Sequence, residues 1–431
     1  MPFQRLYVLH TPELIQIIQS KANATTFVPN LLDFGMLFSG LNAESQSILR
    51  KAFGKHGNAF TMSVHKYLLS GPSLNTATRT AMDRLSASLP NSFADNRKGA
   101  MLGTLRHELT LALTGAIYGP ENPDFVPGIS HLLYCRFPRI TARRALNARG
   151  RVIGAFRKYF ETGGHLQAFS MVPEMYNLNL RTGLASGETA KMEIATSLAM
   201  LSSGANTTFW FLYQIFSDSQ ALETIRQELT DVFVEDPDGY VPKRKILSLD
   251  RIKTHCPNLV AMLNETLRYH GTVTNIKQVQ HDTTLADQYL LKKDAIVMIP
   301  GRSIHHNKDI WGASADVFDH RRFLASDSKR NLSSTSAFRP FGAGVTTCPG
   351  RHFSTNVILS LVAMVVLQYD LVPTTGAWVA PTKRNADLWN AMPKPDQDIE
   401  VQFVKRHDEK ESQFKFVWRE AQDATSIAQE I

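Results

Sequence analysis

Apolar and polar residues follow the pattern of amphipathic helices along most of this 431-residue chain. From about residue 102 to residue 200 the apolar positions recur once per helical turn, with interruptions at Tyr118–Gly128 and Phe160–Gly164. A long helical pattern covers Ala190–Val232, and the stretch NLVAMLNETLRYHG predicts a second helix that ends at Gly271. This part of the chain is therefore predicted to be almost entirely helical.

The pattern changes after Gly271. Residues 273–303 alternate between apolar and polar and contain turn residues, which predicts short β-strands. A long irregular stretch then precedes a strongly apolar helix, predicted from about His352 to Gln368, and strand-like sequence returns at IEVQFVK. Together these segments predict a mainly α-helical domain with small β-sheets.

Composition narrows the possible functions. The chain has 47 basic and 39 acidic residues. This excess is mild and scattered, without the basic stripe and interleaved aromatic residues that nucleic-acid binding needs, so we expect no nucleic-acid partner. Cys135, Cys256 and Cys348 are odd in number and unpatterned, which favours a reducing compartment over a disulfide framework. The longest apolar runs are too short or too interrupted to predict a membrane span, and no signal peptide is recognisable.

The stretch FRPFGAGVTTCPGRHFS places a lone cysteine, Cys348, between a glycine-punctuated loop and the apolar helix. Three roles are open for this thiol. It can be a small buried apolar residue, the commonest role of a cysteine, or a nucleophile with His352 as its base, although no nucleophile signature surrounds it. It can also ligate iron, which requires shielding and backbone N–H donors and gains from a helix N-terminus behind the thiolate.

The residues around Cys348 favour the third role. Gly342, Gly344 and Gly350 allow the backbone to turn tightly and to approach a flat ligand. Pro349 suits the first turn of the helix that follows. The spacing of these residues therefore points to a metal-bound thiolate.

The segment Phe341-x-x-Gly344-x-x-x-Cys348-x-Gly350 resembles the heme-binding signature of the cytochrome P-450 monooxygenases. This resemblance implies the family's fold, a helical bundle that encloses heme b (iron protoporphyrin IX), with Cys348 as the axial iron ligand. Four neighbours would surround the cofactor: Phe341, Gly342, Gly344 and Gly350. The resemblance extends over roughly residues 3–405 and is closest in character to the branch of sterol hydroxylases and prostacyclin synthase, with its fungal members.

The resemblance also implies the organisation and location of the protein. Residues 1–406 would form a single catalytic domain that lacks the family's usual N-terminal membrane anchor and first helix and strand. Residues 407–431 fall outside the family pattern, and we expect this tail to be helical or disordered. The family implies the cytosolic surface of the endoplasmic reticulum membrane, whereas the sequence as it stands, without an anchor, is also compatible with the cytoplasm.

Glu265 and Arg268 form a Glu-x-x-Arg pair on one predicted helix. Taken alone, such a pair is an ordinary surface ion pair. Further along, VFDHRRF resembles the family's F-x-P-x-R-F element, with Arg322 in place and His320 instead of the usual proline. The resemblance implies that Glu265, Arg268 and Arg322 form a buried structural network, because a buried charge is costly without a partner.

Heme propionates need cations. By their positions in the family pattern, Arg339 and Lys277 are the candidates, and each can instead be a solvated surface charge. The family's usual Trp-x-x-x-Arg helix is missing, since the corresponding region, SVHKYLLSG, offers only His65 and Lys66.

Oxygen activation in this family uses a long helix with an acid followed by a threonine, which deliver protons. This chain offers two registers. The motif letters SGANTT give Asn206 and Thr207, whereas counting back from the helix end gives Ser202 and Ser203, which we prefer because the following segment then matches without a gap. Ser203 and Thr207 are therefore the candidate catalytic hydroxyls. Either can instead bond back to the carbonyl one turn earlier.

The resemblance implies a heme-dependent monooxygenase that hydroxylates a lipophilic small molecule in secondary-metabolite or sterol/terpenoid metabolism, with O2 and electrons from NADPH through a flavoprotein NADPH-cytochrome reductase. Because the acid is missing, a heme-thiolate isomerase or dehydratase that needs no reductase is an alternative, as is a non-catalytic heme-binding protein. A cysteine hydrolase is a further alternative, which would not depend on heme.

The resemblance places the pocket walls at Phe60–Tyr67, residues 151–176, the long helix, Val273–Asn275 and Asp387–Met392, the last with Trp389 and Met392 as apolar contacts. A basic surface would suit an acidic reductase. It would include Lys329, Arg330 and Arg351. Membrane association would run through the family's missing anchor.

Overall fold

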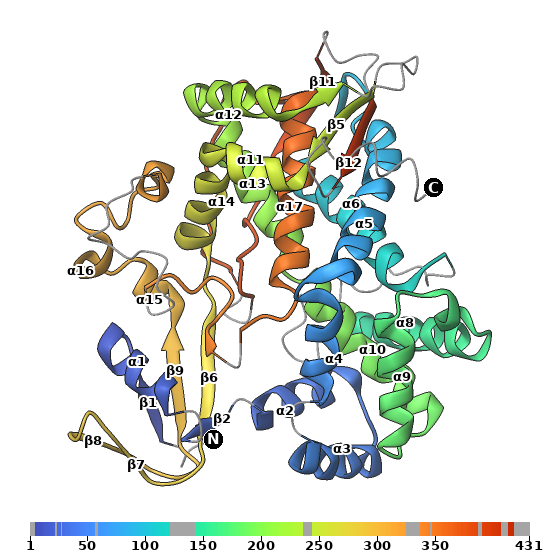
Figure 1. Ribbon diagram of the computed structural model, residues 1–431, viewed down its shortest axis with the longest axis vertical. Helices are drawn as coiled ribbons and strands as arrows, with labels where there is room; N and C mark the ends of the chain where they lie inside the picture. The colour runs from blue at the N-terminus through green and yellow to red at the C-terminus, as the bar shows by residue number, and fades with distance from the viewer. Residues whose placement is uncertain are drawn as a thin grey trace.

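The structure, a computed structural model, describes residues 5–21, 24–26, 28–56, 59–120, 143–235, 244–324, 337–344, 347–386, 390–406 and 413–417. Over these residues the predicted fold class is confirmed: helices dominate and the sheets are small (Figure 1).

The helices are α1 Pro12–Ser20, α2 Val28–Ser39, α3 Ala43–His56, α4 Ala59–Leu68, α5 Gly71–Ser92, α6 Met101–Tyr118, α8 Arg143–Glu161, α9 Met171–Arg181, α10 Ser186–Leu201, α11 Gly204–Phe216, α12 Ser219–Val232, α13 Leu249–His255, α14 Pro257–His270, α15 Gly301–His305, α16 Lys308–Trp311 and α17 Arg351–Gln368, with 3-10 turns at Gly164–Gln167 and His320–Phe323. The strands are β1 Leu6–Val8, β2 Thr25–Thr26, β3 Arg97–Ala100, β4 Val234–Glu235, β5 Arg244–Ser248, β6 Thr274–Val279, β7 Thr283–Leu285, β8 Tyr289–Leu291, β9 Ile296–Pro300, β10 Tyr369–Pro373, β11 Glu400–Lys405 and β12 Gln413–Val417.

Helix α17 is the central helix of the main core. It passes through the middle of the molecule in Figure 1 and contacts α5, α11, α12 and α14. Every residue from Asn356 to Leu367 is buried, because the helix is apolar on all sides. By length and composition α17 would also suit a membrane span, but 72% of its residues are buried inside this fold. The fold therefore uses it as a core helix.

The sheets lie around the edges of the helical core. The largest has the strand order β1-β9-β6-β2, with β1 parallel to β9 and β6 antiparallel to it. It encloses a second apolar core with α1, at the lower left of Figure 1, and the β7-β8 hairpin extends from it. A three-stranded sheet, β10-β11-β3, carries the predicted strand IEVQFVK.

The expectation for the C-terminal tail is wrong at Gln413–Val417. These residues form β12, which pairs in parallel with β5 from Arg244 to Ser248. The sequence QFKFV alternates polar and apolar residues, which suits a strand, and β5 supplies the pairing edge. The other residues of the tail, 407–412 and 418–431, lie outside the described residues.

The long helical pattern over Ala190–Val232 is not one helix. Helix α10 ends at Leu201, Ser202 and Ser203 form a turn, and α11 begins at Gly204. Serine and glycine are weaker helix formers than the leucine and alanine around them, so two serines and a glycine in succession favour a break. The break falls at the residues that the sequence assigned to oxygen activation.

Candidate active site

A cavity of about 400 Å³ lies inside the helical core. Its walls are largely apolar, with Val64 from α4, Leu113 from α6, Met171 from α9 and Met200 from α10 among the contributors. None of the described residues that line it is charged. This size and lining suit an apolar ligand.

The predicted wall segments contribute as follows. Val64 falls in Phe60–Tyr67, Met171 and Met175 in residues 151–176, and Val273 and Met392 in the two later segments. Trp389 lies outside the described residues. The long helical segment contributes several residues, among them Thr196, Ser203 and Thr207. Each of the five predicted segments therefore supplies at least one residue of the cavity lining.

Cys348, which lies just before α17, lines this cavity. Its backbone N–H donates to the Phe341 carbonyl over 2.8 Å, and the Gly342 N–H donates to the Arg339 carbonyl over 3.1 Å. Gly342 and Gly344 have φ values of 77° and 67°, a region that favours glycine, so both are needed for this turn. These two hydrogen bonds close the loop of residues 339–348, which we call the cysteine loop, and its thiol lines the cavity.

The environment of the thiol acts on its charge in two directions. The Cys348 side chain is exposed, and it is exposed toward the cavity that it lines. The surrounding protein walls raise the pKa of the Cys348 thiol, while a backbone hydrogen bond from Gly350 and the positive charge of Arg351 lower it. Burial is the largest of these effects, so the pKa of the Cys348 thiol lies above its ordinary value. The other two interactions act in the opposite direction and favour the thiolate, the form in which cysteine ligates a metal.

The residues around the cavity fit a flat heme. Gly350 lines the cavity beside Cys348, and Gly204 lines it from α11. A Cβ atom added at either glycine would meet open space within 4 Å. Both backbones are therefore open to a ligand that approaches them closely, with a single thiol donor between apolar walls.

The two candidate hydroxyls both reach the cavity. Ser203 and Thr207 line it, one helical turn apart at the α10–α11 break. The Thr207 hydroxyl also donates to the Ser203 carbonyl over 2.9 Å, which is the back-bond left open as its alternative role. Asn206 does not line the cavity: it is buried, and its amide donates to the Met392 carbonyl over 2.9 Å.

Glu265, Arg268 and Arg322 come together in one buried network. Arg268 Nε donates to Glu265 Oε2 over 2.7 Å with both side chains fully buried, and Arg322 Nε donates to Glu265 Oε1 over 3.1 Å. Arg268 also donates to the carbonyls of His305 and Ala315. The simple reading of Glu265 and Arg268 as a surface ion pair is therefore wrong.

Arg339 and Lys277 are both buried, at 1% and 7% exposure, so neither is a solvated surface charge. Arg339 Nη2 donates to Asn275 Oδ1 over 2.8 Å, and the Gln19 amide, with its oxygen turned toward Arg339, accepts over 3.1 Å. Burial lowers the pKa of Arg339 to about 10. Burial and the nearby Arg339 charge lower the pKa of Lys277. Two buried cations that repel each other would be stabilised by an anionic ligand.

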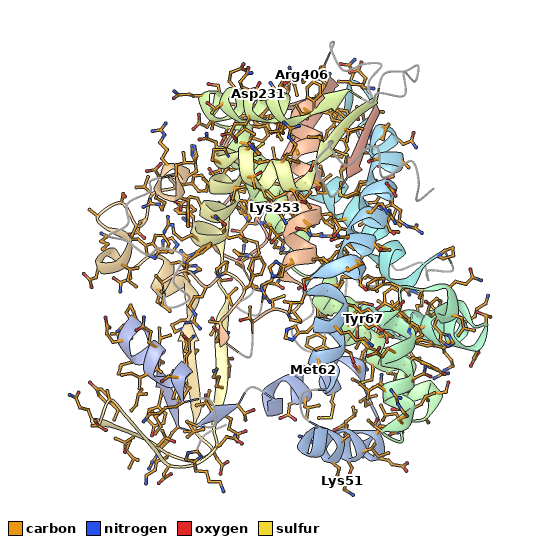
Figure 2. All side chains as sticks on the ribbon, viewed as in Figure 1. Lys51, Met62, Tyr67, Asp231, Lys253 and Arg406 are labelled. Carbon is orange, nitrogen blue, oxygen red and sulfur yellow. The ribbon has the colours of Figure 1, made fainter. Side chains whose placement is uncertain are left out.

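Lys66 pairs with an acid on α9. Its Nζ donates to Glu174 Oε2 over 2.6 Å, and Tyr67, which lies on the α9 side of α4 in Figure 2, donates to the same oxygen over 2.5 Å. Burial alone would raise the pKa of Glu174, but these hydrogen bonds lower it below its ordinary value. Lys66 thus joins α4 to α9, which together form one wall of the cavity.

Sequence reasoning missed a buried acid on the cavity helix α10. Glu193 is 2% exposed, and burial raises its pKa to about 7. The Tyr118 hydroxyl donates to Glu193 Oε2 over 3.0 Å and lies 3.0 Å from the Ser197 hydroxyl. The available signal was a glutamate at a core position of the helical pattern, three residues before Thr196 of the cavity lining.

Comparison with known proteins agrees with this site. The cytochrome P450 family model matches residues 195–397. A cytochrome P450 monooxygenase of Hypoxylon pulicicidum, nodJ, is 28% identical over 96% of this chain and 84% of its own length. A cytochrome P450 monooxygenase of Gibberella zeae is 27% identical over 73% of this chain and 64% of its own length. The human 7-alpha-hydroxycholest-4-en-3-one 12-alpha-hydroxylase is 28% identical over 38% of this chain.

These matches confirm the resemblance seen in the sequence, and they cover the glycine-flanked Cys348, the Glu-x-x-Arg helix and the cavity wall at Ser203 and Thr207. The family implies a heme-thiolate cofactor and a redox partner. The chain belongs to the cytochrome P450 family and is a monooxygenase, an oxidoreductase that incorporates oxygen from O2.

Proposed function

We propose that this chain holds heme b through the Cys348 thiolate and hydroxylates a lipophilic small molecule, with electrons from NADPH delivered by a flavoprotein reductase. The observation that carries the proposal is the Cys348 thiol in a largely apolar cavity whose described lining residues include no charged side chain. When bound there, heme supplies the activation of O2, which protein side chains alone do not provide.

The cysteine loop and the buried cations would hold the cofactor. Cys348 is the iron ligand, and Phe341, Gly342, Gly344 and Gly350 shape the loop around it. Arg339 and Lys277 supply positive charge for the propionates, which would offset the repulsion between these two buried cations.

Ser203 and Thr207 would serve proton delivery from the α10–α11 break. Both hydroxyls line the cavity, and a hydroxyl can accept a proton from one neighbour and donate to another. Neither register puts an acid at the usual place: Ser202 takes that place in one, and Asn206, whose amide donates to the Met392 carbonyl, takes it in the other. We therefore propose that bound water completes the relay beside these two hydroxyls.

The substrate class follows from the cavity walls. Leucine, methionine and valine side chains can bury an apolar skeleton, and they offer few polar contacts for orienting a charged one. One of the relatives is named as a hydroxylase of a cholestenone. A terpenoid, sterol or other lipophilic metabolite is the substrate class that we propose, in secondary-metabolite or sterol/terpenoid metabolism.

The reductase would dock on the side of the molecule that carries the N-terminus of α17. Arg351 and Lys253 both lie close enough to His352 to lower its pKa, after the effect of burial. Lys253, labelled in Figure 2, donates to Asn356 Oδ1 on α17 over 2.6 Å. This basic cluster suits an acidic flavoprotein. Lys329 and Arg330 lie outside the described residues. The cytosolic face of the endoplasmic reticulum membrane is the location that we propose.

The test is the carbon-monoxide difference spectrum of the reduced, heme-reconstituted chain beside Cys348→Ala. We expect a red-shifted Soret band that the variant loses, because the shift requires a thiolate on the iron. A chain that takes up heme without this band, or an equal band in Cys348→Ala, would overturn the assignment of Cys348.

The reaction type is tested next, with NADPH and a reductase. Turnover that needs both supports hydroxylation. Turnover of a substrate without either would instead support the isomerase or dehydratase chemistry that the missing acid left open. Heme uptake without any substrate-induced spectral change, across a panel of sterols and terpenoids, would support the non-catalytic alternative.

A further inference from the structure

His305 occupies a buried position between the charged network and the cysteine loop. It is the last residue of α15, fully buried. Its ring lies beside two aromatic rings, with centroid distances of 5.8 Å to Phe338 and 6.5 Å to Trp311. An aromatic side chain without nitrogen atoms would fill this space as well, so packing alone does not explain a histidine here.

Two hydrogen bonds give His305 its particular place. Its backbone carbonyl accepts from Arg268 Nη1 over 2.5 Å, and its ring Nε2 accepts from the Arg339 backbone N–H over 3.0 Å. Through these bonds one residue contacts both the Glu265 network and the first residue of the cysteine loop.

The ring is held in one protonation state. Because Nε2 accepts from the Arg339 amide, the neutral ring carries its proton on Nδ1. Nδ1 has no hydrogen-bond partner among the described residues. Burial, together with the Arg268, His306 and Arg339 charges, lowers the pKa of His305 to about 3, so the ring stays neutral at physiological pH. The neutral ring therefore acts as the hydrogen-bond acceptor for the Arg339 backbone amide.

The contacts continue from Arg339 into the thiol loop. The Arg339 carbonyl accepts from the Gly342 N–H, and the Phe341 carbonyl accepts from the Cys348 N–H. The hydrogen-bonded path thus runs from Arg268 through His305 and Arg339 to the turn that carries Cys348. A shift of the Arg339 backbone would change the position of its guanidinium and of this turn together.

We propose that His305 is a positioning residue that fixes the Arg339 backbone, and through it the Cys348 loop, against the buried Glu265–Arg268–Arg322 network. This rests on the proposed role of the loop in heme binding. Removal of the Nε2 acceptor leaves the buried Arg339 amide without that partner, which costs far more than the loss of an exposed hydrogen bond. The chain still folds, but the loop is held less firmly.

The experiment compares His305→Phe, His305→Gln and His306→Phe with the wild type. Phenylalanine keeps the ring and removes the acceptor, while the glutamine side-chain oxygen can reach the place of Nε2. His306→Phe is the matched control, because the adjacent histidine bonds to Asp316 Oδ1 and the Tyr269 carbonyl rather than to the Arg339 amide.

Two measurements are made on each protein. The first is the rate of heme loss from the reconstituted enzyme to an acceptor protein, expected to be about tenfold faster in His305→Phe and within about twofold of wild type in His305→Gln and His306→Phe. The second is amide hydrogen exchange of residues 337–344 in the heme-free chain. We expect faster exchange in His305→Phe and not in His306→Phe. Both variants lose a histidine, but only His305 accepts a hydrogen bond from the Arg339 amide.

Equal heme loss in His305→Phe and wild type, with unchanged exchange at Arg339, would overturn the proposal while the red-shifted Soret band keeps the proposed function intact. If His305→Phe fails to fold, His305→Asn replaces it, because its shorter side chain cannot place an acceptor at Nε2. Equal heme loss in the Asn and Gln variants would then overturn it. A wild type without the thiolate band would instead refute the proposed function itself.

Discussion

Glu265 and Glu193 are both buried carboxylates, and they are held in opposite ways. Glu265 on α14 is fully buried and bonded to two guanidinium groups, Arg268 and Arg322. Glu193 on α10 is 2% exposed and accepts from the neutral Tyr118 hydroxyl. The same residue type thus serves in one case as the centre of an ion network and in the other as a carboxyl that is neutral through much of the range below pH 7.

The difference reflects what each region must do. The Glu265 network binds the backbone carbonyls of His305, Ala315 and Val317 through Arg268, so it holds the segments that carry them in one arrangement. The Glu193 region joins α10 to α6 at the cavity wall, and Tyr159 adds a hydrogen bond to the Tyr118 carbonyl. The first region is fixed by charge, and the second depends on the protonation of one carboxyl.

Glu265→Gln should have the largest effect. The substitution leaves Arg268 and Arg322 without their carboxylate, and an uncompensated buried charge costs about 3–5 kcal/mol of the free energy of unfolding. Urea unfolding of the heme-free chain measures this loss. Glu223→Gln on the exposed side of α12 is the matched control and should change little. A loss of less than about 1 kcal/mol for Glu265→Gln would show that the network is not the main support of this region.

Glu193→Gln should have a smaller effect that depends on pH. A carboxyl whose pKa is raised from 4.5 to about 7 holds a proton in the folded state that the unfolded chain releases. Its contribution to stability is therefore complete below pH 4.5 and is lost as the pH rises to about 7. Between about pH 5 and pH 8 the wild type should lose about 2–3 kcal/mol relative to Glu193→Gln.

Urea unfolding of the wild type and Glu193→Gln at the two pH values checks this prediction. Glu223→Gln again serves as the control, since an exposed glutamate should leave the pH dependence of the wild type unchanged. A parallel pH dependence in the wild type and Glu193→Gln would mean that Glu193 ionises in the folded protein as readily as it does in the unfolded chain.

Lys66→Gln should have the smallest effect. Its ammonium pairs with Glu174, but the lysine side chain is 60% exposed, and water and salt screen such a pair. The Tyr67 hydroxyl still donates to Glu174 when the ammonium is removed. We expect an unfolding midpoint that matches the wild type in high salt and is barely lower in low salt. A much lower unfolding midpoint in both high and low salt would show that the wall formed by α4 and α9 depends on this ion pair.

Much of the site could be predicted from local sequence. The glycine spacing around Cys348 is a backbone requirement, and Gly342 and Gly344 have the positive φ values that only such a turn needs. The apolar run after Cys348 gave α17 within one residue, because a helix without a polar face has few alternatives to burial. Such features act over a few residues, so the sequence expresses them directly.

Other features could not be predicted because they depend on contacts between distant segments. The break at Ser202–Ser203 lies within a continuous helical pattern, and β12 pairs with a strand more than 150 residues away. The orientation of Asn206 toward Met392, and of Lys66 toward Glu174, depends on which neighbour the fold brings within reach.

The sequence by itself determined the family and the helical fold class, and it singled out Cys348 as the thiol that we propose for a heme iron, because these follow from spacing along the chain. Only the tertiary structure decided which charges are buried and what each one faces. Burial turned Glu193 into a carboxyl with a pKa of about 7 and His305 into a neutral acceptor for the Arg339 amide. Both outcomes arise from desolvation, which depends on the surrounding fold and leaves no mark in the order of residues.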